Sequence, residues 1–162
     1  MTRLFLTTAL ASLFIAAASF AATDMVSAVD VTIDLPAVTN KAAAARYTNI
    51  SDDLKNAIMS RLVDRLADEG VKVGVDISEV ELSNSFTETI GSADTHLQGI
   101  VSITDVKDNS NFKSYTLTVD VNQAKTFFPA TVDISKLSAS SDEYYQAMIQ
   151  AFAQSVVDRL AS

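Results

Sequence analysis

The sequence predicts an α+β fold: a single two-layer domain in which two amphipathic helices cover one face of a mostly antiparallel sheet of about four strands. Four short segments alternate apolar and polar residues, which is the period of a strand with one buried face. Two longer segments repeat apolar residues at helical spacing. The elements follow in the order β-α-β-β-β-α, and no stretch between them resembles a linker between domains.

The first strand is predicted over residues 29–35, and Pro36 ends it. The first helix is predicted from Ser51 to Gly70. Ser51 is a candidate N-cap, and the two aspartates that follow it suit the positive end of the helix dipole. Gly70 is expected at the C-terminal cap, where glycine is favoured. The expected buried stripe consists of Leu54, Ile58, Met59, Leu62, Val63 and Leu66.

Three more strands follow this helix. The second strand is predicted over residues 71–77, and a bulge is expected near Ser78 and Glu79 because the apolar residues beyond them change parity. Residues 97–103 and 115–121 are predicted to form a hairpin whose turn is rich in Asp, Asn and Ser.

The last quarter of the chain is predicted to be an extended passage over residues 123–141, in which Thr131 to Ile134 could pair briefly, followed by a second helix that begins at Ser141. Both predicted helices open with Ser-Asp-acid and close with Val-Asp-Arg-Leu-Ala. Either an internal duplication or convergence explains this likeness. In both cases we expect the two helices to pack on the same face of the sheet.

The composition excludes several classes of function. The chain has 162 residues, no cysteine, one histidine and a formal net charge of −8. The length allows a core without disulfides or a structural metal, and the lack of cysteine excludes thiol catalysis and thiolate metal sites. Nucleic acid is not an expected partner, because binding a phosphate backbone requires a cationic surface.

Residues 1–21 resemble a secretory signal peptide. Arg3 precedes an apolar run from Leu4 to Phe20, and Ser19 and Ala21 supply the small residues that a cleavage site needs. We expect cleavage after Ala21, which leaves 22–162 as a single α+β domain, periplasmic or secreted and without stable membrane insertion. An uncleaved membrane anchor is the alternative.

No catalytic, metal-binding or cofactor-binding site is predicted. His96 stands alone, and no Gly-x-Ser-x-Gly elbow accompanies it. Two of the acidic pairs lie in first turns of helices, where the dipole explains them, and the acidic turn after residue 104 lacks the spacing of a calcium loop. We therefore expect a protein that is not an enzyme and uses no cofactor.

Three phenylalanines are candidates for contact with a partner. Phe127 and Phe128 are neighbours in a passage predicted to be extended, so their side chains would face opposite sides and one of them would be exposed. The alternative is that one packs under a helix and the other under a loop. Phe86, in a polar loop, is likewise either an exposed contact residue or packed within the fold.

A resemblance to known proteins adds to these expectations. A helix ending at Leu66 to Gly70 precedes a valine-rich strand over Val71 to Ile77, and the hairpin follows with Ala93, Asp94, Leu97, Gly99, Val101 and Ile103. This order resembles small α/β domains of Gram-negative envelope auxiliary proteins of the lipopolysaccharide-assembly lipoprotein type. The chain departs from them in lacking an acylated cysteine, and the resemblance transfers no functional residues.

Together these observations favour a non-enzymatic binding or assembly-accessory protein of the bacterial envelope. Its free sheet face or sheet edge would contact an envelope protein partner. The sequence predicts neither the identity of this partner nor the oligomeric state of the chain. The alternative is a carrier of a small apolar ligand, held in a cavity between the helices and the sheet.

Overall fold

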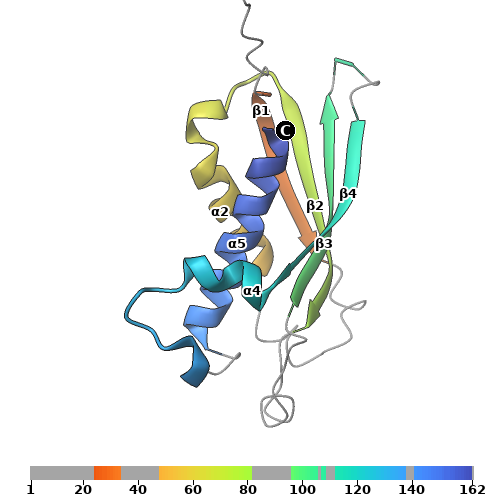
Figure 1. Ribbon diagram of the computed structural model, residues 1–162. Coiled ribbons are helices and arrows are strands. Elements are labelled where there is room, and N and C mark those ends of the chain that lie inside the picture. The colour runs from red at the N-terminus through yellow and green to blue at the C-terminus, as the bar shows by residue number, and fades with distance from the viewer. Residues whose placement is uncertain are drawn as a thin grey trace, which may run out of the picture.

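The computed structural model describes residues 24–33, 48–81, 96–105, 107–108, 112–137 and 141–161. These residues form two layers, a sheet and a pair of helices that cover one side of it (Figure 1). The predicted signal segment with Ala21, and the candidate contact Phe86, lie outside the described residues.

The sheet contains four strands in the spatial order β1-β2-β3-β4. They are β1 (Val26–Ile33), β2 (Val71–Glu81), β3 (His96–Asp105) and β4 (Phe112–Asp120). β1 and β2 pair in parallel, whereas the other two neighbouring pairs are antiparallel, so the sheet is mixed. The parallel pair arises because a helix returns the chain to the end of the sheet at which β1 begins. A register shift between Ile77 and Glu79 confirms the predicted bulge.

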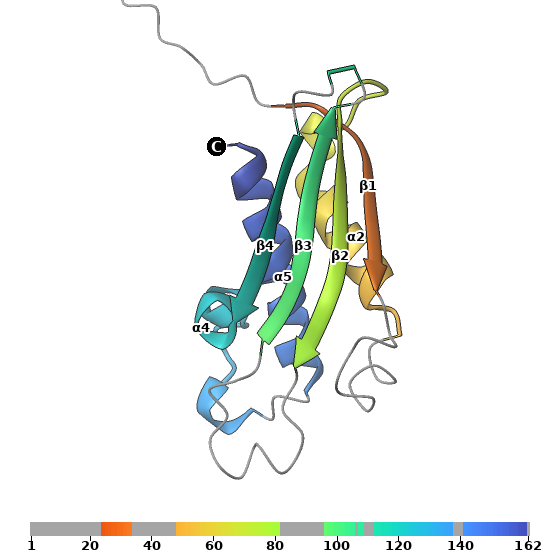
Figure 2. The same cartoon turned by 90° about the vertical axis from the view of Figure 1, so that its right-hand side faces the viewer.

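Two main helices, α2 (Ile50–Arg61) and α5 (Asp142–Leu160), lie together on one side of this sheet (Figures 1 and 2). The start of α5 is as predicted, because the Ser141 Oγ accepts a hydrogen bond from the Tyr144 N–H at 3.1 Å. Apolar side chains from both layers form one core between them. Those with no exposed surface include Leu54, Ile58, Leu62, Ile77, Val101, Val119, Phe152 and Val156.

Polar contacts join the two helices at the side of the core. The Tyr145 hydroxyl donates to Asp53 Oδ2 at 2.6 Å. The Arg61 guanidinium donates to the side-chain oxygens of Gln150 at 2.6 Å and Gln154 at 3.1 Å. Partial burial of this guanidinium lowers the pKa of Arg61 from its usual value. These bonds set the position of α2 along α5.

The first helix is shorter than predicted. α2 ends at Arg61 instead of Gly70, and a 3-10 turn over Val63–Arg65 follows it. Val63 and Leu66 are 65% and 37% exposed, so neither belongs to the buried stripe. Ser51 is not the cap either, because Asn49 occupies that position without a side-chain bond.

Pairing with β1 explains this early end. Leu66 forms a parallel bridge to Val26, and the Ala67 N–H donates to the Val26 carbonyl at 3.1 Å. The Arg65 guanidinium donates to the Asp24 carbonyl at 2.8 Å. Tertiary hydrogen bonds thus replace those that a continued helix would have made, which helical periodicity alone does not predict.

The passage after β4 contains several helical turns instead of being extended. It contains α4 (Val121–Ala124) and 3-10 turns over Lys125–Phe127 and Ile134–Lys136, and Thr131 to Ile134 do not pair with the sheet. A capping box starts α4: Asp120 Oδ1 accepts from the Gln123 N–H at 3.0 Å, and Gln123 Oε1 accepts from the Asp120 N–H at 2.9 Å. The prediction overlooked this Asp-x-x-Gln pattern.

Gly70 is required by a close approach of two backbone segments. A Cβ added at Gly70 would lie 2.2 Å from the carbonyl oxygen of Met25, which itself accepts a hydrogen bond from the Val71 N–H at 2.8 Å. We expect Gly70→Ala to lower the free energy of unfolding by about 2–3 kcal/mol, because the β1 backbone must move. Urea denaturation followed by circular dichroism measures this.

Gly74→Ala is the matched control. Its added Cβ would meet a hydroxyl, Ser102 Oγ, at 2.6 Å, and a serine side chain can rotate away. Its unfolding free energy should stay within about 0.5 kcal/mol of the wild type. An equal loss in both variants would contradict the special role of Gly70.

Tyr115 carries a buried hydroxyl that has no hydrogen-bond partner among the described residues. Its burial raises the pKa of Tyr115, an effect that the charge of Arg159 opposes, and the Arg159 guanidinium lies 4.5 Å from the ring centroid. We expect Tyr115→Phe to keep the ring contact and to leave stability unchanged or up to about 1 kcal/mol higher at neutral pH.

Alkaline titration provides a second readout of this variant. Because the pKa of Tyr115 is higher in the folded chain, the unfolded chain ionises first, and stability falls as the pH rises above about 10. Tyr115→Phe should reduce the steepness of this fall in urea denaturation. A large loss of stability at neutral pH would contradict an unpaired hydroxyl.

Candidate functional site: the uncovered sheet face

One face of the sheet is covered by no helix of the described ranges. Figure 2 looks onto this face, with α2 and α5 behind the strands. Because side chains alternate across a strand, every second residue points away from the helices. We call these twelve residues the open face: Ala28, Asp30, Thr32, Lys72, Gly74, Asp76, Ile100, Ser102, Thr104, Phe112, Ser114 and Thr116.

The pairing registers arrange the open face in rows across the sheet. One row runs through Asp30, Gly74, Ser102 and Ser114, and the next runs through Thr32, Asp76, Ile100 and Thr116. Most members are hydroxyl-bearing or charged, as expected of a solvated sheet face. Ile100 and Phe112 are the large apolar members of the face, with 46% and 59% of their surfaces exposed. Both belong to the alternating set of strand residues that points away from the core.

A depression of about 320 Å³ lies within these rows. The depression forms because Gly74 has no side chain. The Ser102 hydroxyl lies at its edge and donates a hydrogen bond to the Gly74 carbonyl at 3.4 Å. The residues that line the depression are Asp30, Thr32, Gly74, Val75, Asp76, Ile100 and Ser102. An apolar side chain and two carboxylates therefore share one hollow.

Among the described residues, the two carboxylates of this depression have only weak partners. The Lys55 ammonium, which comes from α2, lies 3.7 Å from Asp30, and both side chains are well exposed. The Thr32 hydroxyl lies 3.4 Å from Asp76 Oδ1 and 3.4 Å from the Val75 carbonyl, so it is shared between two acceptors. Exposed ion pairs and long hydrogen bonds contribute little, so both carboxylates can accept further donors.

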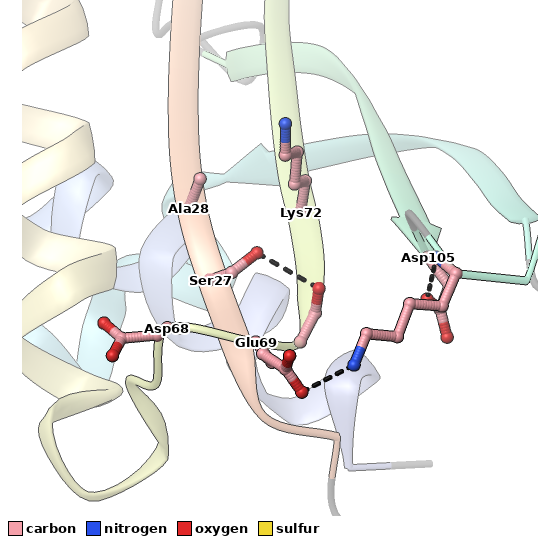
Figure 3. Close-up of a pocket in the computed structure, with 8 residues that line it drawn as sticks. Ser27, Ala28, Asp68, Glu69, Lys72 and Asp105 are labelled. Carbon is pink, nitrogen blue, oxygen red and sulfur yellow. Dashed lines mark hydrogen bonds and ion pairs between the residues drawn. The ribbon is translucent and has the colours of Figure 1, made fainter.

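A second depression, of about 520 Å³, lies at the end of the sheet where β2 begins (Figure 3). Its lining consists of Ser27, Ala28, Asp68, Glu69, Gly70, Lys72, Asp105 and Lys107. Several of its polar groups bind one another: the Lys107 ammonium pairs with Glu69 at 2.5 Å, and the Ser27 hydroxyl donates to the Gly70 carbonyl at 3.1 Å. These contacts stabilise the loop before β2.

The described parts of the chain hold no obvious catalytic centre. Within them, no three His, Asp or Glu side chains are grouped so that they could hold a metal ion. His96 begins β3 and lies opposite Asp120 in the strand register. None of the described helices has the length and hydropathy needed to cross a bilayer. The arrangement can bind through hydrogen bonds, charge and apolar contact.

Two of the predicted contact residues, Phe127 and Phe128, lie away from the open face. Phe128 is only 8% exposed, and its ring packs edge-on against Tyr144 with centroids 5.6 Å apart. Phe127 ends a 3-10 turn and is partly buried against the core. Of these two, Phe127 is therefore the one whose ring a partner could reach, and its contact with a partner stays a prediction.

The sequence predicted a partner contact at a free sheet face or sheet edge, but it singled out none of the residues of the open face. A signal was present at Ile100, an apolar residue in the polar phase of the third strand, between Gln98 and Ser102. Single exposed apolar residues are common on soluble proteins, so this signal alone is weak. What the sequence does not reveal is that Ile100 lies beside the hollow at Gly74, because strand register places them together.

Ile100 should contribute little to the fold. We expect Ile100→Thr to change the unfolding free energy by less than about 0.5 kcal/mol, because the side chain is half exposed and threonine suits a strand. Its neighbour Val101, with no exposed surface, is the matched control, and Val101→Ala should cost about 2 kcal/mol. Urea denaturation compares them, and an equal cost would mean that Ile100 is structural.

No protein-family model and no curated protein sequence matches the chain. Solved structures that resemble it include a Xanthomonas campestris protein of the DUF330 family, at 12% identity and a TM-score of 0.48 over 89% of this chain and 88% of that one. A variant of PelC from Paraburkholderia phytofirmans, described as a dodecamer, has 12% identity and a TM-score of 0.43 over 86% and 87%.

A candidate lipoprotein from Caulobacter crescentus has 12% identity and a TM-score of 0.41 over 82% of this chain and 87% of that one. These neighbours come from Gram-negative bacteria. With TM-scores no higher than 0.48 and identities of 12%, the likenesses assign neither a family nor a function to the chain.

Proposed function

We propose that the chain is an exported, non-enzymatic accessory protein of the bacterial envelope that binds a protein partner through its open face. The observation that carries this proposal is the exposure of Ile100 and Phe112 on a sheet face that no described helix covers. A solvated sheet face does not need these apolar side chains, and a partner that covered them would remove their apolar surface from water.

The first 21 residues support export. Their order of one arginine, an apolar run and small residues is that of a cleaved secretory signal, so the domain would act in the periplasm or outside the cell. A non-enzymatic role is supported by the position of the lone histidine at a strand end and by the mutual pairing of Glu69 and Lys107 in the larger depression.

The alternative of an apolar-ligand carrier has less support. It requires a cavity between the helices and the sheet, and the buried side chains described there, including Phe152, Ile58 and Val101, pack as one core. Neither of the two depressions described above lies between the layers.

Site-specific photocrosslinking in the native host tests the proposal. A photoreactive p-benzoylphenylalanine placed at Ile100 or Thr116 should give a discrete adduct with an envelope protein. The same group at Val63, which is 65% exposed but lies after α2 on the helix side, is the matched control and should give none. Intact mass of the uncrosslinked protein should show a chain that starts at Ala22.

Three results would contradict the proposal. Equal adducts from positions 63 and 100 would mean that the open face has no special role. The absence of any adduct from positions 100 and 116, with the protein folded and exported, would mean that this face binds no protein. A membrane-bound chain that starts at Met1 would mean that residues 1–21 are an uncleaved membrane anchor and not a cleaved signal.

A further inference from the structure

The hollow at Gly74 has the features of a subsite for one side chain of the partner. We propose that it receives an arginine of the protein that binds the open face, an inference that rests on the proposed function and names the chemistry of its partner. The guanidinium would lie between the carboxylates of Asp30 and Asp76, and its aliphatic stem would lie on Ile100.

The shape of the open face supports this proposal. Gly74 brings no side chain to the middle of the face, between Asp30 and Ser102 on the neighbouring strands, and the Ser102 Oγ, which lies 2.6 Å from where a Cβ would be, fills only part of the space. The resulting volume of about 320 Å³ is open to solvent and large enough for a single long side chain. A sheet face with an unfilled position can receive a side chain from an adjacent polypeptide, as interfaces between partners often do.

The charges around this hollow favour a cationic side chain. Asp30 and Asp76 occupy diagonal positions on neighbouring parallel strands, so two carboxylates border one empty position. Their present partners, Lys55 at 3.7 Å and a shared threonine hydroxyl at 3.4 Å, leave acceptor capacity on both groups. A cation placed between them would gain from both, and the formal net charge of −8 also attracts a basic partner.

An arginine suits this hollow better than a metal ion does. A bare metal ion is not favoured, because no third ligand of the kind it needs joins these two aspartates within the described residues. A guanidinium offers five donors in a planar fork and can reach two carboxylates and the Ser102 hydroxyl together. Its weak hydration and apolar stem suit contact with Ile100, which is 46% exposed at the rim.

A titration followed by nitrogen-15 NMR tests the subsite on the purified chain without its leader. The probe is a blocked pentapeptide, Thr-Val-Arg-Val-Thr, and the matched probe carries citrulline in place of arginine. The arginine peptide should shift the amide resonances of Gly74, Ile100 and Ser102. The citrulline peptide keeps the shape without the charge and should bind about fivefold more weakly.

Variants of the chain locate the effect. Asp30→Asn and Asp76→Asn should each weaken binding of the arginine peptide about fivefold, and Gly74→Ala should weaken it by filling the hollow. Asp64→Asn removes the same charge from an exposed position after α2 and should leave binding unchanged. Equal weakening by Asp64→Asn, equal binding of the two peptides, or shifts confined to other residues would overturn the proposal.

The same aspartate variants separate this proposal from the proposed function. If crosslinking from position 100 gives the same adduct at the same yield in a chain with both Asp30→Asn and Asp76→Asn, the open face binds its partner without a cation, and only the arginine subsite is wrong. If the wild-type chain gives no adduct, the proposed function is wrong whatever the peptide does. Loss of the adduct in the double variant supports both.

Discussion

The parallel pairing of β1 with β2 is the constraint on which the other features depend. A parallel pair requires the chain to return to the starting end of the sheet, and α2 makes this return across one face. α5 then packs beside α2, and Tyr145 and Arg61 hold the two helices in register through hydrogen bonds to Asp53, Gln150 and Gln154. Both helices occupy one side, so the opposite side of the sheet stays free of helices among the described elements.

Because the helices cover only one side, the side chains of the strands fall into two sets, one facing the helices and one on the open face. Residues that face the helices are held by close packing, and a change in their volume affects the whole domain. Residues on the open face are free of that requirement and can vary with function. Ile100, Phe112 and the empty position at Gly74 lie in this second set, and packing against the core explains none of them.

Much of the fold was predictable because hydrophobic periodicity reports which side of an element is buried. The period of two located all four strands, including the parity change at the β2 bulge, and Ser141 located the start of α5. Two elements were predicted wrongly, because hydrophobic periodicity does not report the hydrogen bonds that compete with a regular helix or strand. Leu66 continues a helical stripe in sequence but pairs with Val26, and the capping box of Asp120 and Gln123 turns a passage that lacks any periodic pattern into α4.

The candidate site was much less predictable than the fold. Phe127 and Phe128 were singled out because adjacent aromatics in an extended chain point to opposite sides, but Phe127 ends a 3-10 turn and only Phe128, which follows it, has an extended backbone. The open face depends on registers between strands distant in sequence, such as Gly74 opposite Ser102. A single sequence does not report such registers, and neither a glycine nor a serine by itself marks a binding site.

The guanidinium of Arg65 donates to the carbonyl of Asp24 at one described end and lies 3.4 Å from that of Leu160 near the other. One side chain thus holds both ends of the domain at one pole, where Figure 1 also places the start of β1 beside the C-terminus. A fusion protein or a tether joined at either end would project from that pole, leaving the broad side of the strands unobstructed. Joining the two ends by a short peptide would also be geometrically easy, which makes the domain a natural scaffold for circular permutation.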